Sequence, residues 1–176
     1  MAYRQLLELA RRSLIANIKE LNFPIKLSLV LTYRCNAKCF MCNIWRKERK
    51  DELSLQDIDR FFAKSNRFSW IDICGGEIFL RDDVFEVIET ILRRSKNIFL
   101  LHFATNGLLT ERIVPCVEKI LRLKPPKLLA TVSLDGYREL NDVIRGVPGG
   151  YDKAMATFRE LRKFNSASFK VFLGMT

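Results

Sequence analysis

The chain has 176 residues, of which 30 are Lys or Arg and 20 are Asp or Glu, so its net charge is +10 at pH 7. A hydrophobic content of 48%, with only 8 Gly and 5 Pro, excludes a disordered or collagen-like chain and predicts one folded domain. No apolar stretch approaches the roughly 20 residues that span a bilayer, and charged side chains between Arg4 and Arg12 interrupt any signal peptide. We therefore expect a soluble, cytoplasmic protein without a transmembrane segment.

The first 24 residues predict a basic, amphipathic helix, because their apolar side chains recur at helical spacing. Two interpretations are open for the apolar face: it covers the open side of the domain, or it lies on a membrane surface. We expect packing on the domain. Residues 1–24 are thus interpreted as an N-terminal helix and residues 25–176 as the domain that follows it.

Beyond Pro24 the chain alternates between apolar runs and helical patterns. Strands are predicted at 26–31, 68–73, 98–104, 128–134 and 169–175. Helices are predicted after the capping box Ser54-Leu55-Gln56-Asp57 and at 84–94, 110–123 and 152–164, with Pro115 favouring a start of the third nearer Val114.

This alternation predicts an α/β fold, a parallel sheet with right-handed crossovers. A complete eight-stranded barrel needs about 250 residues, so we expect a partial (β/α) TIM-like barrel, truncated after about four to five β/α units. Such a barrel leaves a sheet edge that a partner chain or an oligomer would cover.

Five cysteines, at positions 35, 39, 42, 74 and 116, are an odd number and argue against a disulfide framework. Three of them form a C-x3-C-x2-C pattern directly after the first strand. Three thiolates can ligate three irons of a [4Fe–4S] cube and leave the fourth iron without a protein ligand. The alternative is a zinc knuckle completed by Cys74. We expect Cys74 to be buried, with a thiol in the active site near the cluster as the alternative. The single histidine, His102, is expected in the core, with an inward position near a bound cofactor as the alternative.

The loop Cys35-Asn36-Ala37-Lys38-Cys39-Phe40-Met41-Cys42 resembles that of the radical S-adenosylmethionine (SAM) superfamily. A second signature, Gly75-Gly76-Glu77, ends the second strand. The resemblance implies that Cys35, Cys39 and Cys42 hold the cluster. It also implies that backbone groups of Gly75 and Gly76, together with Glu77, bind the amino group of SAM. The likeness spans residues 26–176.

Polar residues also end the third and fourth predicted strands, where parallel barrels assemble their sites. By resemblance, Thr105 and Ser133 contact the ribose or carboxylate of SAM. Asn106 and Asp135 are further candidates, with a helix cap or glycine turn as the alternative for each.

Two more candidates follow from the family resemblance. Arg145 lies in the segment 141–146, which resembles members with a SPASM-type or twitch-type extension, and it either pairs with the SAM carboxylate or anchors its loop. Met41 occupies a position that is often aromatic and stacks near adenine.

The resemblance implies a SAM-cleaving enzyme, or the N-terminal part of one. Its cofactors would be a [4Fe–4S] cluster and SAM, and its partners an unidentified substrate and an external flavodoxin-like or ferredoxin-like electron donor. The charge of +10 permits an RNA-modifying enzyme as an alternative, although the basic residues are interspersed with acidic ones, as on a solvated surface. A non-catalytic Fe–S binding fragment is the other alternative.

Overall fold

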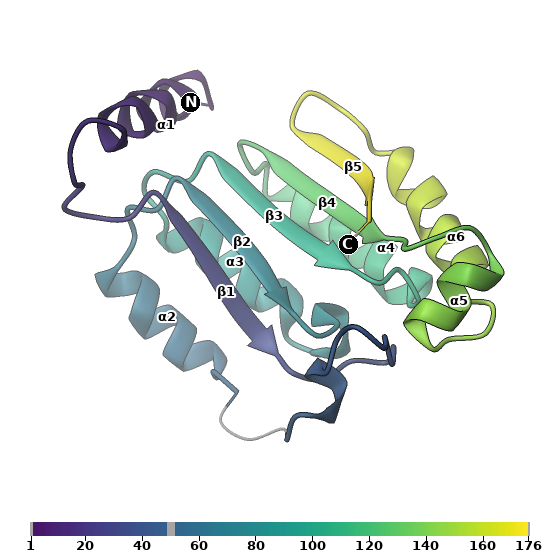
Figure 1. The fold of residues 1–176 in the computed structure, drawn as a ribbon. Helices are drawn as coiled ribbons and strands as arrows, with labels where there is room; N and C mark the ends of the chain where they lie inside the picture. The colour runs from purple at the N-terminus through teal and green to yellow at the C-terminus, as the bar shows by residue number, and fades with distance from the viewer. Residues whose placement is uncertain (1, 49–51, 176) are drawn as a thin grey trace.

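The computed structural model describes residues 2–48 and 52–175 of the chain. Five strands form one sheet in which neighbours follow chain order and every pair is parallel (Figure 1). The strands are β1 (Lys26–Thr32), β2 (Trp70–Gly75), β3 (Leu100–Thr105), β4 (Leu128–Ser133) and β5 (Phe169–Gly174). The predicted α/β fold, a partial TIM-like barrel with a parallel sheet, is confirmed.

Helices join consecutive strands and cover one face of the sheet (Figure 1). Because side chains alternate between the two faces of a strand, Leu101 and Phe103 of β3 are fully buried while His102 between them is partly exposed on the other face. The helices are α2 (Leu55–Lys64), α3 (Val84–Arg94), α4 (Thr110–Arg122), α5 (Glu139–Arg145) and α6 (Gly150–Arg162), with short 3-10 helices η1 (Ile44–Arg46) and η2 (Ile78–Leu80).

Local sequence signals explain some helix boundaries better than others. The capping box at the start of α2 is confirmed, since Asp57 N donates to Ser54 Oγ and Ser54 N donates to Asp57 Oδ2. The predicted start of α4 at Thr110 is confirmed, so the alternative start nearer Val114 is wrong and Pro115 lies inside the helix. Burial of the apolar side of α4 in the core outweighs the local penalty of the proline.

Helix α1 (Ala2–Ala16) lies beyond the amino ends of the strands (Figure 1). The buried Arg12 side chain attaches it, with Nη2 donating to the carbonyl of Phe23 at 2.6 Å and Nη1 to that of Arg67 at 2.8 Å. Apolar side chains elsewhere on α1, including Leu7 and Leu14, are exposed. The expectation that this apolar face packs on the domain is therefore wrong, because a guanidinium makes the attachment.

Among residues 2–48 and 52–175, no helix combines the length and the apolar character that crossing a membrane requires.

Candidate functional site

A cavity of about 260 Å³ lies at the carboxyl ends of the strands. Loops that follow β1 to β4 contribute to its wall, as expected for a parallel sheet. Its lining residues are Cys35, Ala37, Cys39, Met41, Cys42, Ile44, Cys74, Gly75, Gly76, Ala104, Thr105, Asn106, Ser133, Asp135 and Arg145. The cavity thus brings together five segments distant in sequence: the cysteine loop, the paired glycines, the end of β3, the end of β4, and Arg145.

The cysteine loop, residues 35–42, is fastened to the end of α5. Lys38 N donates to the carbonyl of Arg145 at 2.9 Å, and Phe40 N donates to that of Ile144 at 3.0 Å. Gly146, which has a left-handed φ of +62°, follows directly, and a Cβ there would lie 2.7 Å from the carbonyl oxygen of Lys38. Both the backbone conformation and the close approach of the loop therefore require glycine at this position.

The three thiols of the cysteine loop are free and differ in exposure, with Cys35 and Cys39 half-buried and Cys42 exposed. Burial raises the pKa of Cys35, while Asn106 opposes this by donating from Nδ2 to its Sγ at 3.8 Å. Burial also raises the pKa of Cys39, against the opposing charge of Arg145. For both thiols burial outweighs these opposing contacts, so their pKa values lie above the ordinary value in this structure.

The paired glycines connect the end of β2 to the beginning of the cysteine loop. Gly76 N donates to the carbonyl of Thr32 and Glu77 N to that of Arg34, both at 2.8 Å. Gly75 has a φ of +136°, and a Cβ at Gly76 would overlap the carbonyl of Arg34. Side chains at these positions would push the cysteine loop away from β2.

Glu77 lies behind the cavity wall and is fully buried. Its carboxylate accepts hydrogen bonds from Thr105 Oγ1 at 2.9 Å and from Asn106 N at 2.8 Å. Burial raises its pKa to about 7, despite these hydrogen bonds. In this structure Glu77 positions two residues that line the cavity, and its direct contact with SAM stays a prediction.

Arg145 and Asp135 form a buried ion pair at the cavity wall, with 2.6 Å between Arg145 Nη2 and Asp135 Oδ2. Asn141 Oδ1 accepts a hydrogen bond from Asp135 N at 3.0 Å, which fixes the turn after β4. Of the two roles expected for Arg145, anchoring of its loop is observed. Contact with the SAM carboxylate stays a prediction.

The other predicted residues all line the cavity. Asn106 makes the Asx-type turn expected as its alternative role, accepting from Leu108 N at 3.0 Å, and it also donates to Asn36 Oδ1 at 2.7 Å. Thr105 and Ser133 lie at the ends of β3 and β4. Met41 lines the cavity while remaining exposed.

Comparison with known families agrees with this geometry. The model of the Radical SAM superfamily matches residues 29–176. The chain belongs to the radical SAM superfamily. Members of this family are enzymes that bind a [4Fe–4S] cluster and SAM.

Several curated radical SAM proteins resemble the chain. It is 31% identical over 161 residues to the mycofactocin maturase MftC of Mycobacterium tuberculosis, covering 89% of this chain and 39% of that protein. It is 33% identical over 156 residues to the Fe-coproporphyrin III synthase of Methanosarcina barkeri, covering 83% and 35%. The identity is 27% over 148 residues to the antilisterial bacteriocin subtilosin biosynthesis protein AlbA of Bacillus subtilis, covering 81% and 31%. The chain thus spans about a third of the length of these relatives.

Solved radical SAM structures share the fold. The structure of Streptococcus suis SuiB bound to S-adenosylmethionine aligns with a TM-score of 0.67 at 21% identity, covering 96% of this chain and 38% of SuiB. SuiB bound to precursor peptide SuiA aligns with a TM-score of 0.66 at 20% identity, covering 98% and 36%.

The donor set of the cavity fits the family cofactors. Three free thiols from one loop border the same cavity, and an amide donor lies at the sulfur of Cys35. In the described part of the chain, no three His, Cys, Asp or Glu side chains converge as the ligands of a single metal ion do. Cys74 is only half-buried and lines the cavity, so the expectation that it is buried is wrong.

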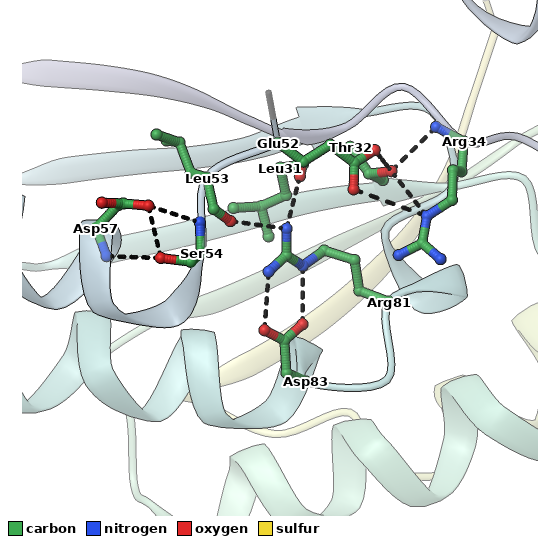
Figure 2. Close-up of polar contacts among 9 residues, drawn as sticks. All are labelled: Leu31, Thr32, Arg34, Glu52, Leu53, Ser54, Asp57, Arg81 and Asp83. Carbon is green, nitrogen blue, oxygen red and sulfur yellow. Dashed lines mark hydrogen bonds and ion pairs between the residues drawn. The ribbon is translucent and has the colours of Figure 1, made fainter. Parts of the chain in front are cut away.

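Sequence analysis missed a polar brace that holds both ends of the segment containing the cysteine loop (Figure 2). The buried Arg81 donates from Nη1 to the carbonyls of Leu31 at 3.0 Å and Leu53 at 3.1 Å, and it pairs with Asp83. Glu52 accepts from Thr32 Oγ1 at 2.6 Å. This brace joins the residues before the cysteine loop to those that begin α2, and no sequence motif marks it.

His102 lies on the sheet face opposite the helices, in the middle of β3, whose carboxyl end borders the cavity. Its Nδ1 is 2.6 Å from Asp72 Oδ1 and its Nε2 is 2.9 Å from Thr131 Oγ1. Burial opposes ionisation of Asp72, but hydrogen bonds from His102 and Lys26 hold its pKa below the usual value. His102 is thus a hydrogen-bonded, partly exposed side chain rather than a fully enclosed one.

Proposed function

We propose that this chain carries the catalytic core of a radical SAM enzyme that cleaves SAM reductively and abstracts hydrogen from an unidentified substrate. The observation that carries the proposal is the shared cavity, in which the three thiols of the cysteine loop face a glycine-rich strand end and a guanidinium. The apolar core lies on the other side of the sheet, under the helices, so the three free thiols are not part of that core.

In this proposal Cys35, Cys39 and Cys42 hold the [4Fe–4S] cluster, and one iron has no protein ligand. The cluster held there would supply the one electron that reductive cleavage of SAM requires. The proposed SAM-binding residues are Met41, Gly75, Gly76, Glu77, Thr105, Asn106, Ser133, Asp135 and Arg145.

The residues of the chain would perform three tasks. Gly75 and Gly76 expose backbone to the ligand, since no side chain covers them. Glu77 holds Thr105 and Asn106 at the cavity wall through its carboxylate. The ion pair between Arg145 and Asp135 keeps charged groups of both signs beside a ligand that carries an ammonium and a carboxylate, while offsetting the cost of burying the pair.

The test is anaerobic reconstitution with iron and sulfide, followed by incubation with SAM and dithionite. We expect about four irons per chain, a change of the reduced EPR signal on addition of SAM, and formation of 5′-deoxyadenosine. Cys39→Ala should abolish all three. Cys116→Ala is the matched control, because Cys116 is buried in α4 and does not line the cavity.

Bound zinc without sulfide would refute the proposal. A cluster that forms but leaves SAM intact would instead identify the non-catalytic alternative. RNA binding that falls steeply with salt, together with SAM cleavage, would favour the RNA-modifying alternative.

A further inference from the structure

Helix α1 carries an apolar stripe on the side that is turned away from the domain. Its members are exposed, and they lie on α1 or in the turn that follows it: Tyr3, Leu6, Leu7, Leu14 and Ile18. Leu7 is 53% exposed and Leu14 is 68% exposed, whereas Arg12, two residues before Leu14, is buried and attaches the helix. We call the five apolar residues the α1 stripe. Contiguous exposed apolar side chains of this kind mark interaction surfaces.

The connections at the amino ends of the strands are basic and contain no acidic residue. Helices α2, α3, α4 and α6 each end in a base, and further bases precede the next strand. The segments 64–69, 94–99, 122–127 and 162–168 hold nine bases and no Asp or Glu: Lys64, Arg67, Arg94, Lys96, Arg122, Lys124, Lys127, Arg162 and Lys163. We call these four segments the basic connections.

The opposite ends of the strands have no such charge excess. The connections that follow β1 to β4, residues 33–54, 76–83, 106–109 and 134–138, hold eight bases and seven acids. The helix dipole favours one base at the end of each helix, but it does not account for the five bases that lie beyond the helix ends. The net charge of +10 is therefore concentrated at the amino ends of the strands.

Several cations of the basic connections are available to a partner. Lys64, Lys96, Lys124 and Arg162 are exposed, and within the described part of the chain no acidic side chain pairs with them. The pairs that do occur, such as Arg94 with Asp59 at 2.7 Å, use other bases of these segments. An anionic partner would therefore meet cations that are not already neutralised.

A groove of about 630 Å³ joins the α1 stripe to the basic connections. Its wall includes Leu7 of the stripe, Lys96 of the connection before β3, and Arg4 and Arg11 of α1. The acid in this wall, Glu8, pairs with Arg11 at 2.8 Å, so Arg4 and Lys96 leave the groove with a net positive charge. Apolar and basic groups thus border one another on the same side of the molecule.

We propose that the α1 stripe and the basic connections together bind the surface of an anionic phospholipid membrane. A lipid surface matches both features, because apolar side chains enter the acyl boundary while lysines and arginines lie among the phosphates. The phosphates of a nucleic acid would match the bases but leave the α1 stripe exposed to water. A second copy of the chain would bring two basic surfaces together.

This inference goes beyond the proposed function and does not depend on it. Because α1 lies beyond the amino ends of the strands, membrane binding there leaves the cavity at the carboxyl ends pointing away from the lipid (Figure 1).

The experiment is flotation of the full chain with vesicles, either of phosphatidylcholine alone or of equimolar phosphatidylcholine and phosphatidylglycerol. The first variant is Leu7→Glu with Leu14→Glu, which places two negative charges in the α1 stripe. Its matched control is Leu140→Glu with Val143→Glu, because these side chains are 58% and 72% exposed on α5, at the other end of the strands.

The second variant tests the charge. Lys96→Glu with Lys124→Glu reverses two cations of the basic connections. Lys47→Glu with Lys153→Glu is the matched control, since it changes the net charge by the same amount at two exposed positions outside those segments.

Wild type should float with the anionic vesicles and remain behind with pure phosphatidylcholine, and raising the salt should weaken its binding. Each base near an anionic surface is worth about fivefold in affinity, so the partition coefficient of Lys96→Glu with Lys124→Glu should fall at least tenfold. Loss of two inserted leucines should lower the partition coefficient of Leu7→Glu with Leu14→Glu at least tenfold as well. Both control variants should match wild type.

Absence of wild-type binding to the anionic vesicles would overturn the inference, and so would equal binding by a variant and its control. Binding of an RNA oligonucleotide that is lost in the lysine variant but kept in the leucine variant, without vesicle binding, would assign the basic connections to nucleic acid instead. A wild-type dimer that Leu7→Glu with Leu14→Glu abolishes, again without vesicle binding, would assign the α1 stripe to a second copy of the chain. The assay needs neither cluster nor SAM, so failure of SAM cleavage would leave its result unchanged.

Discussion

Replacing Gly146 by Ala tests whether the end of α5 shapes the cysteine loop. The substitution places a side chain at a left-handed φ of +62°, which costs about 1–2 kcal/mol for a residue other than glycine. It also places a Cβ 2.7 Å from the carbonyl oxygen of Lys38, a distance that the structure must relieve. If the loop moves away, the hydrogen bonds from Lys38 N and Phe40 N are lost, at about 0.5–1.5 kcal/mol each.

The expected total for Gly146→Ala is therefore about 2–5 kcal/mol, or about 4–20 °C in Tm for a chain of this size. Gly149→Ala is the matched control, since Gly149 has a φ of +71° but nothing lies within 4 Å of its added Cβ. It should cost only the backbone strain, about 1–2 kcal/mol.

The assay is denaturant unfolding of both variants, together with the iron content after reconstitution. Gly146→Ala should lose more stability than Gly149→Ala and retain less iron, because the thiols move with the loop. Equal stability and equal iron content in the two variants would refute the view that α5 positions the cysteine loop.

Three further substitutions test other contacts. Burial raises the pKa of Glu77 from 4.5 to about 7, so the protonated carboxyl favours the folded state. The free energy of unfolding should therefore be highest at low pH and fall as pH rises through about 7. Urea unfolding from about pH 5 to 8 should show this pH dependence in wild type and not in Glu77→Gln. Arg81→Met removes a buried donor to two carbonyls and should cost about 2–4 kcal/mol, whereas Arg112→Met, which breaks an exposed ion pair, should change the unfolding free energy by less than about 1 kcal/mol. Pro115→Ala should raise Tm, because alanine restores a backbone donor inside α4 and is up to about 3 kcal/mol more favourable than proline at an unstrained helix position. An unchanged Tm would show that the helix has adapted to the proline.

Features set by local sequence were predictable from the chain itself. The capping box at Ser54 depends on two side chains three residues apart, and the parallel strands depend on apolar runs separated by helical patterns. The cavity was predictable for the same reason, since the ends of parallel strands share one edge of a sheet.

Features set by distant contacts were not predictable. Helix α5 has an outward apolar side and a buried Asn141, which inverts the usual pattern of buried apolar and exposed polar side chains. Arg81 bonds to two carbonyls that lie 50 and 28 residues away, and a carbonyl carries no sequence signature. The exposed apolar face of α1 could not be foreseen either. An arginine in an amphipathic helix is expected at the surface, whereas Arg12 attaches α1 to the domain by donating to distant carbonyls.

The attachment of the cysteine loop to α5 also has a consequence for the order of events during synthesis. Lys38 and Phe40 bond to Arg145 and Ile144, so the loop reaches its final shape only when residues more than 100 positions later have left the ribosome. Until then its thiols are exposed on a nascent chain without the cavity wall around them. On the proposed function, delivery of iron and sulfide would therefore follow completion of β4 and α5 rather than accompany emergence of the cysteines.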